Sequence, residues 1–447
     1  MLLCTICFTP YMINVIFFIM KTKLNNPGGR TLIILLLIFM GLSPHSAAAF
    51  YQETETTGYD TYKGKVVDQN SSRAISSAYL SVDGTNISTV TNSEGDFSLK
   101  VPKDIFETTV TVSAMGYAGQ KLALSYFKEG NTTIEMQESV EELSEVSIFS
   151  ASDAKALVRE VLSKRGDNYF TEDTQMKAFY RETIKKGSRN VSLSEAVVEI
   201  HKKPYDSWAK DEISLIKSRK SADYERLDTL ALKLRGGPFN TLHIDLMKNP
   251  QFIFNQDELD NYEFEFDNPA RINNKYLYVV DFQELYQGEP WYFGKLYIDA
   301  ETLTLVKADF NLNVDDRKAA ANLFVKKKPG GTKAYPVNVN YEVNYREQDG
   351  KWYYGYGRAE LEFVVNWKRK LFNSRYTVNS EMAVTDWERN PDGKVNRDAS
   401  FINERVVMAD DASGFNDMAF WGENNIIEPD KSIENAIEKI QQQMRRN

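Results

Sequence analysis

Few residues of this chain have the type and spacing that catalysis requires. The sequence holds three histidines, and the two beyond residue 49 are His201 and His243. They are followed by Lys-Lys-Pro and Ile-Asp-Leu, so neither begins a His-x-x-Glu or His-Glu-x-x-His zinc motif. A catalytic zinc ion needs three protein ligands, which two isolated histidines do not supply. The sequence therefore predicts no metal site and places both histidines on the surface or at strand ends.

Other catalytic signatures are also missing from the sequence. It contains no Gly-x-Ser-x-Gly nucleophile motif, and the glycine pairs at 236–237 and 330–331 mark turns instead of phosphate loops. The acid pairs Asp315-Asp316 and Asp410-Asp411 lack the spacing of a calcium loop, so we expect both in solvated turns. We therefore predict no catalytic, cofactor-binding or metal-binding residues.

Two basic clusters flank the long strands expected at 335–347 and 351–367. In an up-and-down sheet every second turn lies at the same end, so the clusters should adjoin, away from Asp349. Such an edge suits anionic headgroups or an acidic partner, and solubilising edge charge is the alternative. The predicted contact residues are Lys326, Lys327, Lys328, Lys333, Lys368, Arg369 and Lys370.

The first 49 residues have the pattern of an export signal. Three basic residues precede an apolar run at 32–42, and the alanines at 47–49 offer a cleavage site before Phe50. Translation starts at Met1 or at Met20. Because Cys4 and Cys7 are the only cysteines, the exported chain has no thiol for a disulfide or a lipid anchor. We predict an exported protein that is periplasmic or associated with the outer membrane.

Composition limits the partners of the chain. The formal net charge is −9, and removal of residues 1–49 takes away only bases, so the exported chain is more acidic. Nucleic-acid binding needs a basic surface, so this partner class is excluded. About 400 exported residues exceed the size at which one core stops growing, which predicts two domains.

The first domain is expected at 61–137, where short apolar runs alternate with turns in the pattern of a small β-sandwich. Its recurring sequences are Gly64-Lys65-Val66-Val67-Asp68, Ala78-Tyr79-Leu80-Ser81-Val82, Thr91-Asn92-Ser93-Glu94-Gly95-Asp96-Phe97 and Ser113-Ala114-Met115-Gly116-Tyr117. They resemble the carboxypeptidase regulatory-like domain of envelope proteins. The resemblance implies a transthyretin-like sandwich and, despite the name, no peptidase activity. We expect its core to contain Phe97, Leu99, Val110 and Val112, and an acidic linker to follow at 138–150.

The second domain, 151–447, is expected to be a larger sheet with helices at 152–166 and from Pro429 onward. Alternation is most regular from 335 to 367, which predicts long antiparallel strands with one dry and one wet face. The predicted dry face is Val337, Val339, Tyr341, Val343 and Tyr345, then Tyr353, Gly355, Gly357, Ala359, Leu361, Phe363, Val365 and Trp367. The predicted fold is mainly β: a transthyretin-like β-sandwich followed by a large curved antiparallel sheet, half-barrel-like, with helices at its N- and C-terminal ends.

The dry face has two interpretations. It could be the lipid-facing outside of a membrane barrel, or it could pack under the terminal helices. The chain ends in a charged helix, and the helix at 152–166 needs a sheet face for its apolar stripe, so packing under helices is favoured. Such packing could still leave a hydrophobic groove for a ligand.

Several sequences of the larger domain lie at 194–200, 216–220, 236–239, 294–299 and 420–429, the last reading Phe-Trp-Gly-Glu-Asn-Asn-Ile-Ile-Glu-Pro. They resemble an uncharacterised Bacteroidetes family of exported proteins that carries the regulatory-like domain at its N-terminus. That family has no established activity to transfer. The meander with helical ends is also similar to the half-barrel of lipoprotein carriers, a likeness of architecture alone.

These observations predict a non-enzymatic periplasmic or envelope protein that binds or scaffolds. It would hold an apolar ligand or dock a membrane partner. The alternative is an accessory or degenerate hydrolase without a recognisable motif. The expected partner is an envelope protein or a lipid, with no cofactor.

Overall fold

The computed structural model describes residues 58–127, 130–139, 154–222, 237–254, 259–273, 275–286, 290–324, 331–368, 372–395, 400–404, 406 and 419–446. The predicted signal at 1–49 and residues 140–150 of the predicted linker lie outside the described residues.

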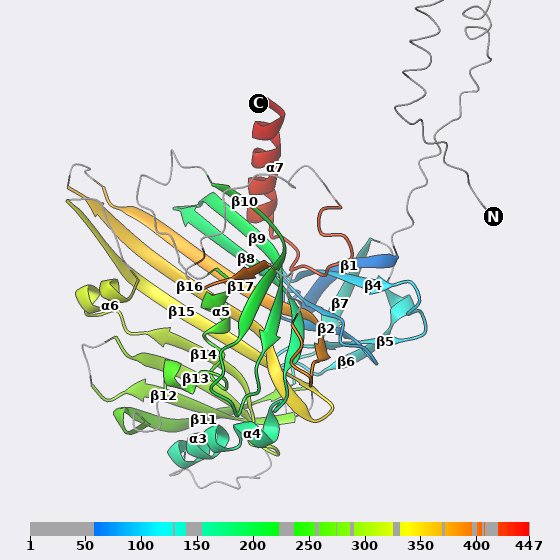
Figure 1. Ribbon diagram of the computed structural model, residues 1–447, viewed down its shortest axis with the longest axis horizontal. Helices are drawn as coiled ribbons and strands as arrows, with labels where there is room; N and C mark the ends of the chain where they lie inside the picture. Colours follow the sequence, from blue (N-terminus) through cyan, green and yellow to red (C-terminus); the bar gives the residue numbers. More distant parts are fainter. Residues whose placement is uncertain are drawn as a thin grey trace, which may run out of the picture. The chain divides into compact units, whose positions relative to one another are not determined.

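The N-terminal module is a sandwich of two small sheets (Figure 1). One sheet has the order β4-β1-β7, with β1 (Tyr59–Asp68), β4 (Asp96–Pro102) and β7 (Asn131–Met136). The other has the order β3-β2-β5-β6, with β2 (Tyr79–Val82), β3 (Ser88–Val90), β5 (Thr109–Ser113) and β6 (Gln120–Ala123), followed by η1 (Leu124–Tyr126). Phe97, Leu99, Val110 and Val112 are buried between the two sheets, as the alternation predicts.

The second region is one large antiparallel sheet of eleven described strands, in the order β11-β12-β13-β14-β15-β16-β17-β8-β9-β10-β18. The strands are β8 (Thr174–Lys186), β9 (Arg189–Lys202), β10 (Glu212–Ala222), β11 (Tyr262–Ile272), β12 (Lys275–Glu284), β13 (Tyr292–Asp299), β14 (Leu305–Leu312), β15 (Thr332–Gln348), β16 (Lys351–Trp367), β17 (Ser374–Arg389) and β18 (Ser400–Ile402). The edges are β11 and β18, so the sheet stays open. The predicted fold class is confirmed.

Short helices lie along and at the ends of this sheet. They are α3 (Ala154–Ser163), α4 (Arg165–Asn168), α5 (Phe239–Leu242), η2 (Pro250–Phe252), η3 (Leu259–Asn261), α6 (Arg317–Phe324) and α7 (Lys431–Arg446). The single helix expected at 152–166 is therefore two, α3 and α4. In the part of the chain that the structure describes, no helix is both long and apolar enough to cross a bilayer.

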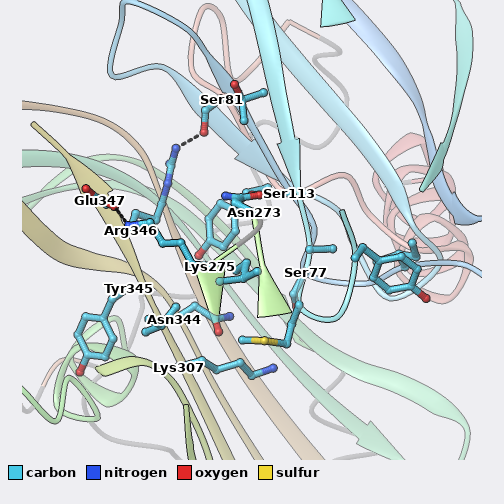
Figure 2. Close-up of a pocket in the computed structure, with 18 of the residues that line it drawn as sticks. Ser77, Ser81, Ser113, Asn273, Lys275, Lys307, Asn344, Tyr345, Arg346 and Glu347 are labelled. Atoms are coloured by element: carbon cyan, nitrogen blue, oxygen red, sulfur yellow. Dashed lines mark hydrogen bonds and ion pairs between the residues drawn. The ribbon is translucent and has the colours of Figure 1, made fainter. Parts of the chain in front are cut away.

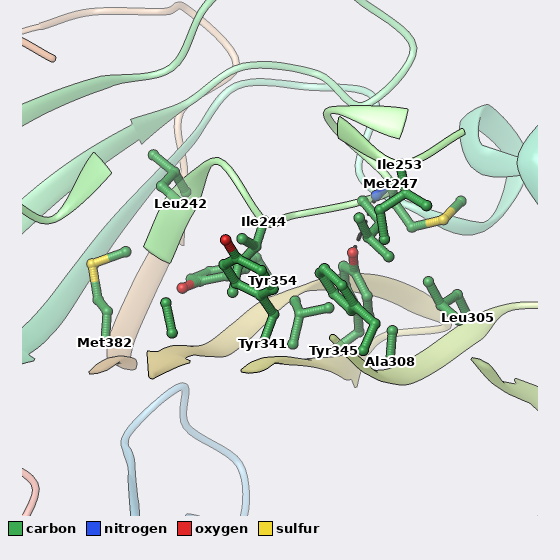
Figure 3. Close-up of a cluster of buried hydrophobic side chains, with 14 of the residues drawn as sticks. Leu242, Ile244, Met247, Ile253, Leu305, Ala308, Tyr341, Tyr345, Tyr354 and Met382 are labelled. Atoms are coloured by element: carbon green, nitrogen blue, oxygen red, sulfur yellow. Dashed lines mark hydrogen bonds between the residues drawn. The ribbon is translucent and has the colours of Figure 1, made fainter. Parts of the chain in front are cut away.

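The apolar face of the sheet is covered by the chain itself. Residues 237–254 cross it and place Leu242, Ile244 and Met247 on Tyr341 and Tyr345 (Figure 3). The stripe of α3, whose buried members are Ala154, Leu157, Val158 and Val161, joins the same core. Packing under helices and loops is therefore the correct interpretation of the dry face.

Two β-bulges change the predicted faces of β15 and β16. On β15 the register shifts between Pro336 and Asn338, so Val337 is the extra residue and is only half-buried. On β16 Gly355 is the extra residue, because Tyr345 pairs with Tyr354 and Asn344 with Tyr356. The predicted inward positions of Val337 and Gly355 are therefore wrong.

The same shift moves Tyr353. This residue pairs with Arg346, while the Tyr354 hydroxyl takes the inward position and donates to the Thr241 carbonyl at 3.0 Å. A single inserted residue reverses the alternation of a strand, and no periodicity in the sequence marks where it occurs.

Candidate functional site

The described residues of the two predicted basic clusters, Lys333 and Lys368, lie at the same end of the β15–β16 hairpin. Lys333 lies opposite Asn366, and the Lys368 backbone N–H donates to the Gly331 carbonyl at 3.2 Å. Asp349 lies in the turn at the other end of this hairpin. The remaining predicted residues, Lys326, Lys327, Lys328, Arg369 and Lys370, lie outside the described residues.

The turn between β8 and β9 lies at this same end. Lys186 pairs with Tyr376 at the start of β17, and the Gly187 N–H donates to the Arg375 carbonyl at 2.9 Å. We call residues 184–191, 331–334, 365–368 and 372–376 the strand-end edge. Sequence reasoning missed its β8–β9 part because β8 and β17 are neighbours in the sheet but far apart in the chain. The sequence does contain a sign that this turn is basic, since two lysines and an arginine flank its glycine.

The strand-end edge is basic and carries an exposed aromatic ring. Its described residues include no Asp or Glu. Arg375 pairs with Glu362, which lies on β16 outside the edge, and Phe372 is 82% exposed. The basic residues of the edge are Lys185, Lys186, Arg189, Lys333, Lys368 and Arg375.

The cleft between the module and the sheet has a volume of about 560 Å³ (Figure 2). Lys307 pairs with Glu342 at 3.1 Å and Asp309 at 3.2 Å, and these carboxylates raise the pKa of its ammonium although burial opposes the charge. Arg346 donates to the hydroxyls of Ser81 and Ser88 of the module.

The remaining lysine of this cleft is also paired. Lys275 contacts Glu347 and lies 3.6 Å from Asp299. Both lysines therefore pair within the sheet, and Arg346 is the cation of this cleft that ties the module to the sheet.

A C-terminal strap, residues 419–430, strengthens this joint. The side chain of Asn425 accepts from the Lys100 N–H at 2.7 Å and donates to the Lys100 carbonyl at 3.1 Å, as a strand partner would. Trp421 is 5% exposed and packs edge-on against Phe179 at 5.4 Å. The sequence at 420–429 thus has a structural role, holding module and sheet together.

A row of charges lies buried beneath the strap. Arg181, Glu195 and Arg219 are direct neighbours on β8, β9 and β10, and Glu381 of β17 continues the row. Glu195 accepts from Arg181 at 2.8 Å and from Arg219 at 2.7 Å. Burial alone would raise the pKa of Glu195, but the two guanidinium groups hold it below its usual range.

The histidines and acid pairs do not form a site among the described residues. His201 is buried 3.4 Å from Glu199, and His243 is half-buried 3.9 Å from Glu404. No group of three or more His, Cys, Asp or Glu in the described ranges could hold a metal ion. Asp316 accepts from the N–H of Ala319 and caps α6, while Asp410 and Asp411 lie outside the described residues. His201 lies at the end of β9, one of the two predicted positions, and β10 and Phe401 bury it there.

Packing over the apolar face leaves little room in the one apolar space found between its covering elements and the described sheet. Between α3, residues 246–254 and β13–β14, the apolar space measures only about 10 Å³, which is room for about one water molecule. The apolar face therefore serves as a hydrophobic core.

Comparison with known proteins identifies the N-terminal module. A family model described as the CarboxypepD_reg-like domain matches residues 62–148. The regulatory-like resemblance is confirmed for this module. No curated protein matches the chain.

Solved structures match the chain weakly. A putative outer membrane lipoprotein-sorting protein domain from Vibrio parahaemolyticus is 10% identical, over 56% of this chain and 96% of that one, with a TM-score of 0.25. The Pseudomonas aeruginosa MucA/MucB complex gives 12% identity over 53% and 99%, with a TM-score of 0.18. A LolA superfamily protein from Nitrosomonas europaea gives 9% over 54% and 97%, also at 0.18. At these scores the likenesses carry no inference about what this chain binds.

Proposed function

We propose that this chain is a non-enzymatic scaffold of the bacterial cell envelope that docks on an anionic membrane surface through its strand-end edge. The observation that carries the proposal is the composition of that edge. Six basic residues at the ends of five neighbouring strands lie there around the exposed Phe372, with no carboxylate among the described residues of the edge.

Electrostatics favour an orientation in which the strand-end edge faces the membrane. The whole chain is acidic, with a net charge of −9, so an anionic surface repels most of it and attracts the edge. Each Lys or Arg held near such a surface contributes about 1 kcal/mol. Phe372 adds an aromatic side chain of the kind that inserts at the membrane–water interface.

Binding to vesicles tests the docking. We expect the mature protein to bind phosphatidylcholine vesicles that contain phosphatidylglycerol, and not vesicles of phosphatidylcholine alone. The triple variant Arg189→Gln, Lys333→Gln, Lys368→Gln should weaken binding by about two orders of magnitude, since it removes three charges of about 1 kcal/mol each. Co-sedimentation at several salt concentrations measures both effects, because added salt should weaken binding of the native protein.

A matched triple variant provides the control. Lys103, Lys210 and Lys394 are exposed lysines outside the edge, and their replacement by glutamine removes the same charge. This control should bind like the native protein. Equal binding by both triple variants, or salt-insensitive binding, would overturn the proposal.

Export is the second part of this proposal. Protein recovered from the periplasmic fraction should begin at or near Phe50, because the three alanines before it form the cleavage site. N-terminal sequencing measures this directly. A mature chain that retained residues 21–49 would contradict it.

A further inference from the structure

A second cavity, of about 510 Å³, opens beside the connection between β9 and β10. One wall is that connection, residues 203–211, and the other is the segment 237–254 that covers the apolar face of the sheet. It is separate from the strand-end edge and from the cleft of the module. Its volume lies within the range of small-molecule binding pockets.

Trp208 stands at this cavity with its indole 73% exposed. An exposed tryptophan is unusual because its large apolar surface is normally buried. The guanidinium of Arg165, from α4, lies 5.0 Å from the ring centroid and holds the ring from one side. The structure therefore presents a flat aromatic surface at the mouth of a cavity.

The connection that carries Trp208 is anchored by buried charges. Lys202 is 1% exposed and pairs with Asp211 at 2.5 Å and Asp245 at 2.8 Å. Burial disfavours its charged form, but these two carboxylates outweigh burial and raise the pKa of Lys202. Asp211 also accepts from the Lys203 N–H at 2.8 Å.

A second lysine fixes the middle of the same connection. The Lys248 ammonium donates to the carbonyls of Pro204 at 2.6 Å and Ser207 at 2.7 Å. The residue before Trp208 is thus tied to the facing wall of the cavity. A wall ordered in advance reduces the entropy that a ligand must overcome on binding.

The lining combines apolar and hydrogen-bonding groups. Phe239, Leu242 and Phe252 supply carbon surface, while Asn249 and Gln251 supply amides. The Asn249 side-chain N–H lies within 3.4 Å of the His243 carbonyl and donates to it, which fixes the amide in the wall. Gln251 is exposed. The charged residues of the lining, Lys210, Lys248, Asp211 and Glu404, are of both signs, so the cavity selects neither an anion nor a cation.

We infer that this cavity binds a carbohydrate, with Trp208 as the surface on which a sugar ring stacks and Asn249 and Gln251 as hydroxyl-binding groups. A sugar ring has a face of C–H groups and a rim of hydroxyls. The indole matches the C–H face, and the Gln251 amide and the Asn249 side-chain oxygen match the hydroxyls. An aliphatic ligand would cover the exposed Gln251 amide without giving it a hydrogen-bond partner, which costs free energy. The inference is independent of the membrane-docking proposal.

A glycan array probed with the mature protein tests the inference. We expect binding to at least one neutral or N-acetylated oligosaccharide, with quenching or a shift of tryptophan fluorescence on titration of that oligosaccharide. Trp208→Ala should weaken this affinity about tenfold or more, and Gln251→Ala should weaken it less. Trp208→Phe should recover part of the loss because it keeps an aromatic face.

Phe106→Ala is the matched control, because Phe106 is 71% exposed and belongs to the module. It should bind like the native protein. Absence of binding across the array would overturn the inference, as would oligosaccharide binding that Trp208→Ala leaves intact. Trp208-dependent capture of a peptide library, without any glycan bound, would show a peptide site instead and would equally overturn it.

Discussion

Replacing Glu195 by glutamine is expected to lower the free energy of unfolding by about 3–5 kcal/mol, the range for breaking a buried ion pair. Glu195 is 1% exposed and accepts from Arg181 on one side and Arg219 on the other. The amide keeps the volume but removes the charge that balances two buried guanidinium groups. Urea unfolding followed by tryptophan fluorescence measures the loss.

Glu388→Gln is the matched control, because Glu388 is an exposed residue of β17. Surface substitutions of this kind change stability by less than about 0.5 kcal/mol. If both variants unfolded at the same urea concentration as the native protein, the charged row would contribute nothing to the fold.

The same carboxylate sets part of the acid sensitivity of the protein. The pKa of Glu195 is lowered in the folded state by Arg181 and Arg219, against the effect of burial. A group with a lowered folded pKa stabilises above its unfolded value, about 4.3 for Glu, and loses that contribution as the pH falls below it. The native protein should therefore lose stability more steeply than Glu195→Gln between about pH 5 and 3.

The sequence predicts those parts of the fold that depend on neighbouring residues. Strict alternation and a short turn predict the β15–β16 hairpin. Because its two strands are antiparallel, Lys333 near the start of β15 and Lys368 after the end of β16 lie at the same end of it. The pairing of β17 with β8 joins segments about 200 residues apart, and alternation contains no information about it. The edge therefore has a second half, on the β8–β9 turn, that only the structure reveals.

The buried row of charges could not be predicted from the sequence for a different reason. Once the β8–β9 and β9–β10 hairpins are in register, Arg181, Glu195 and Arg219 become direct neighbours. The pairing of the two hairpins is enough to predict that these charges attract one another, but it does not predict that they are buried. Trp421 covers them, and it reaches this face from the far end of the chain. Similarly, the Trp208 cavity depends on residues 237–254 lying across the sheet, which no local pattern indicates.

Trp421→Ala is expected to cost about 3–5 kcal/mol, the range for truncating a buried aromatic side chain. Trp421 packs on Phe179 of the sheet and belongs to a buried cluster that also contains Tyr79 and Val90 of the module, so its loss removes packing at the joint. The module has a hydrophobic core of its own. The expected result is therefore a module that stays folded but detaches from the sheet, giving two unfolding transitions in place of one.

Hydrogen exchange locates the detachment. The Lys100 amide donates to the Asn425 side chain of the strap, so it should exchange faster in Trp421→Ala, while amides within the module core keep their protection. Trp208→Ala is the matched control, because Trp208 is 73% exposed. It should change neither the number of unfolding transitions nor the exchange rate of the Lys100 amide. A single transition at the native midpoint would contradict the role of the strap. Vesicle binding should survive the substitution, because the strand-end edge belongs entirely to the large sheet; its loss would mean that the edge requires the module in place.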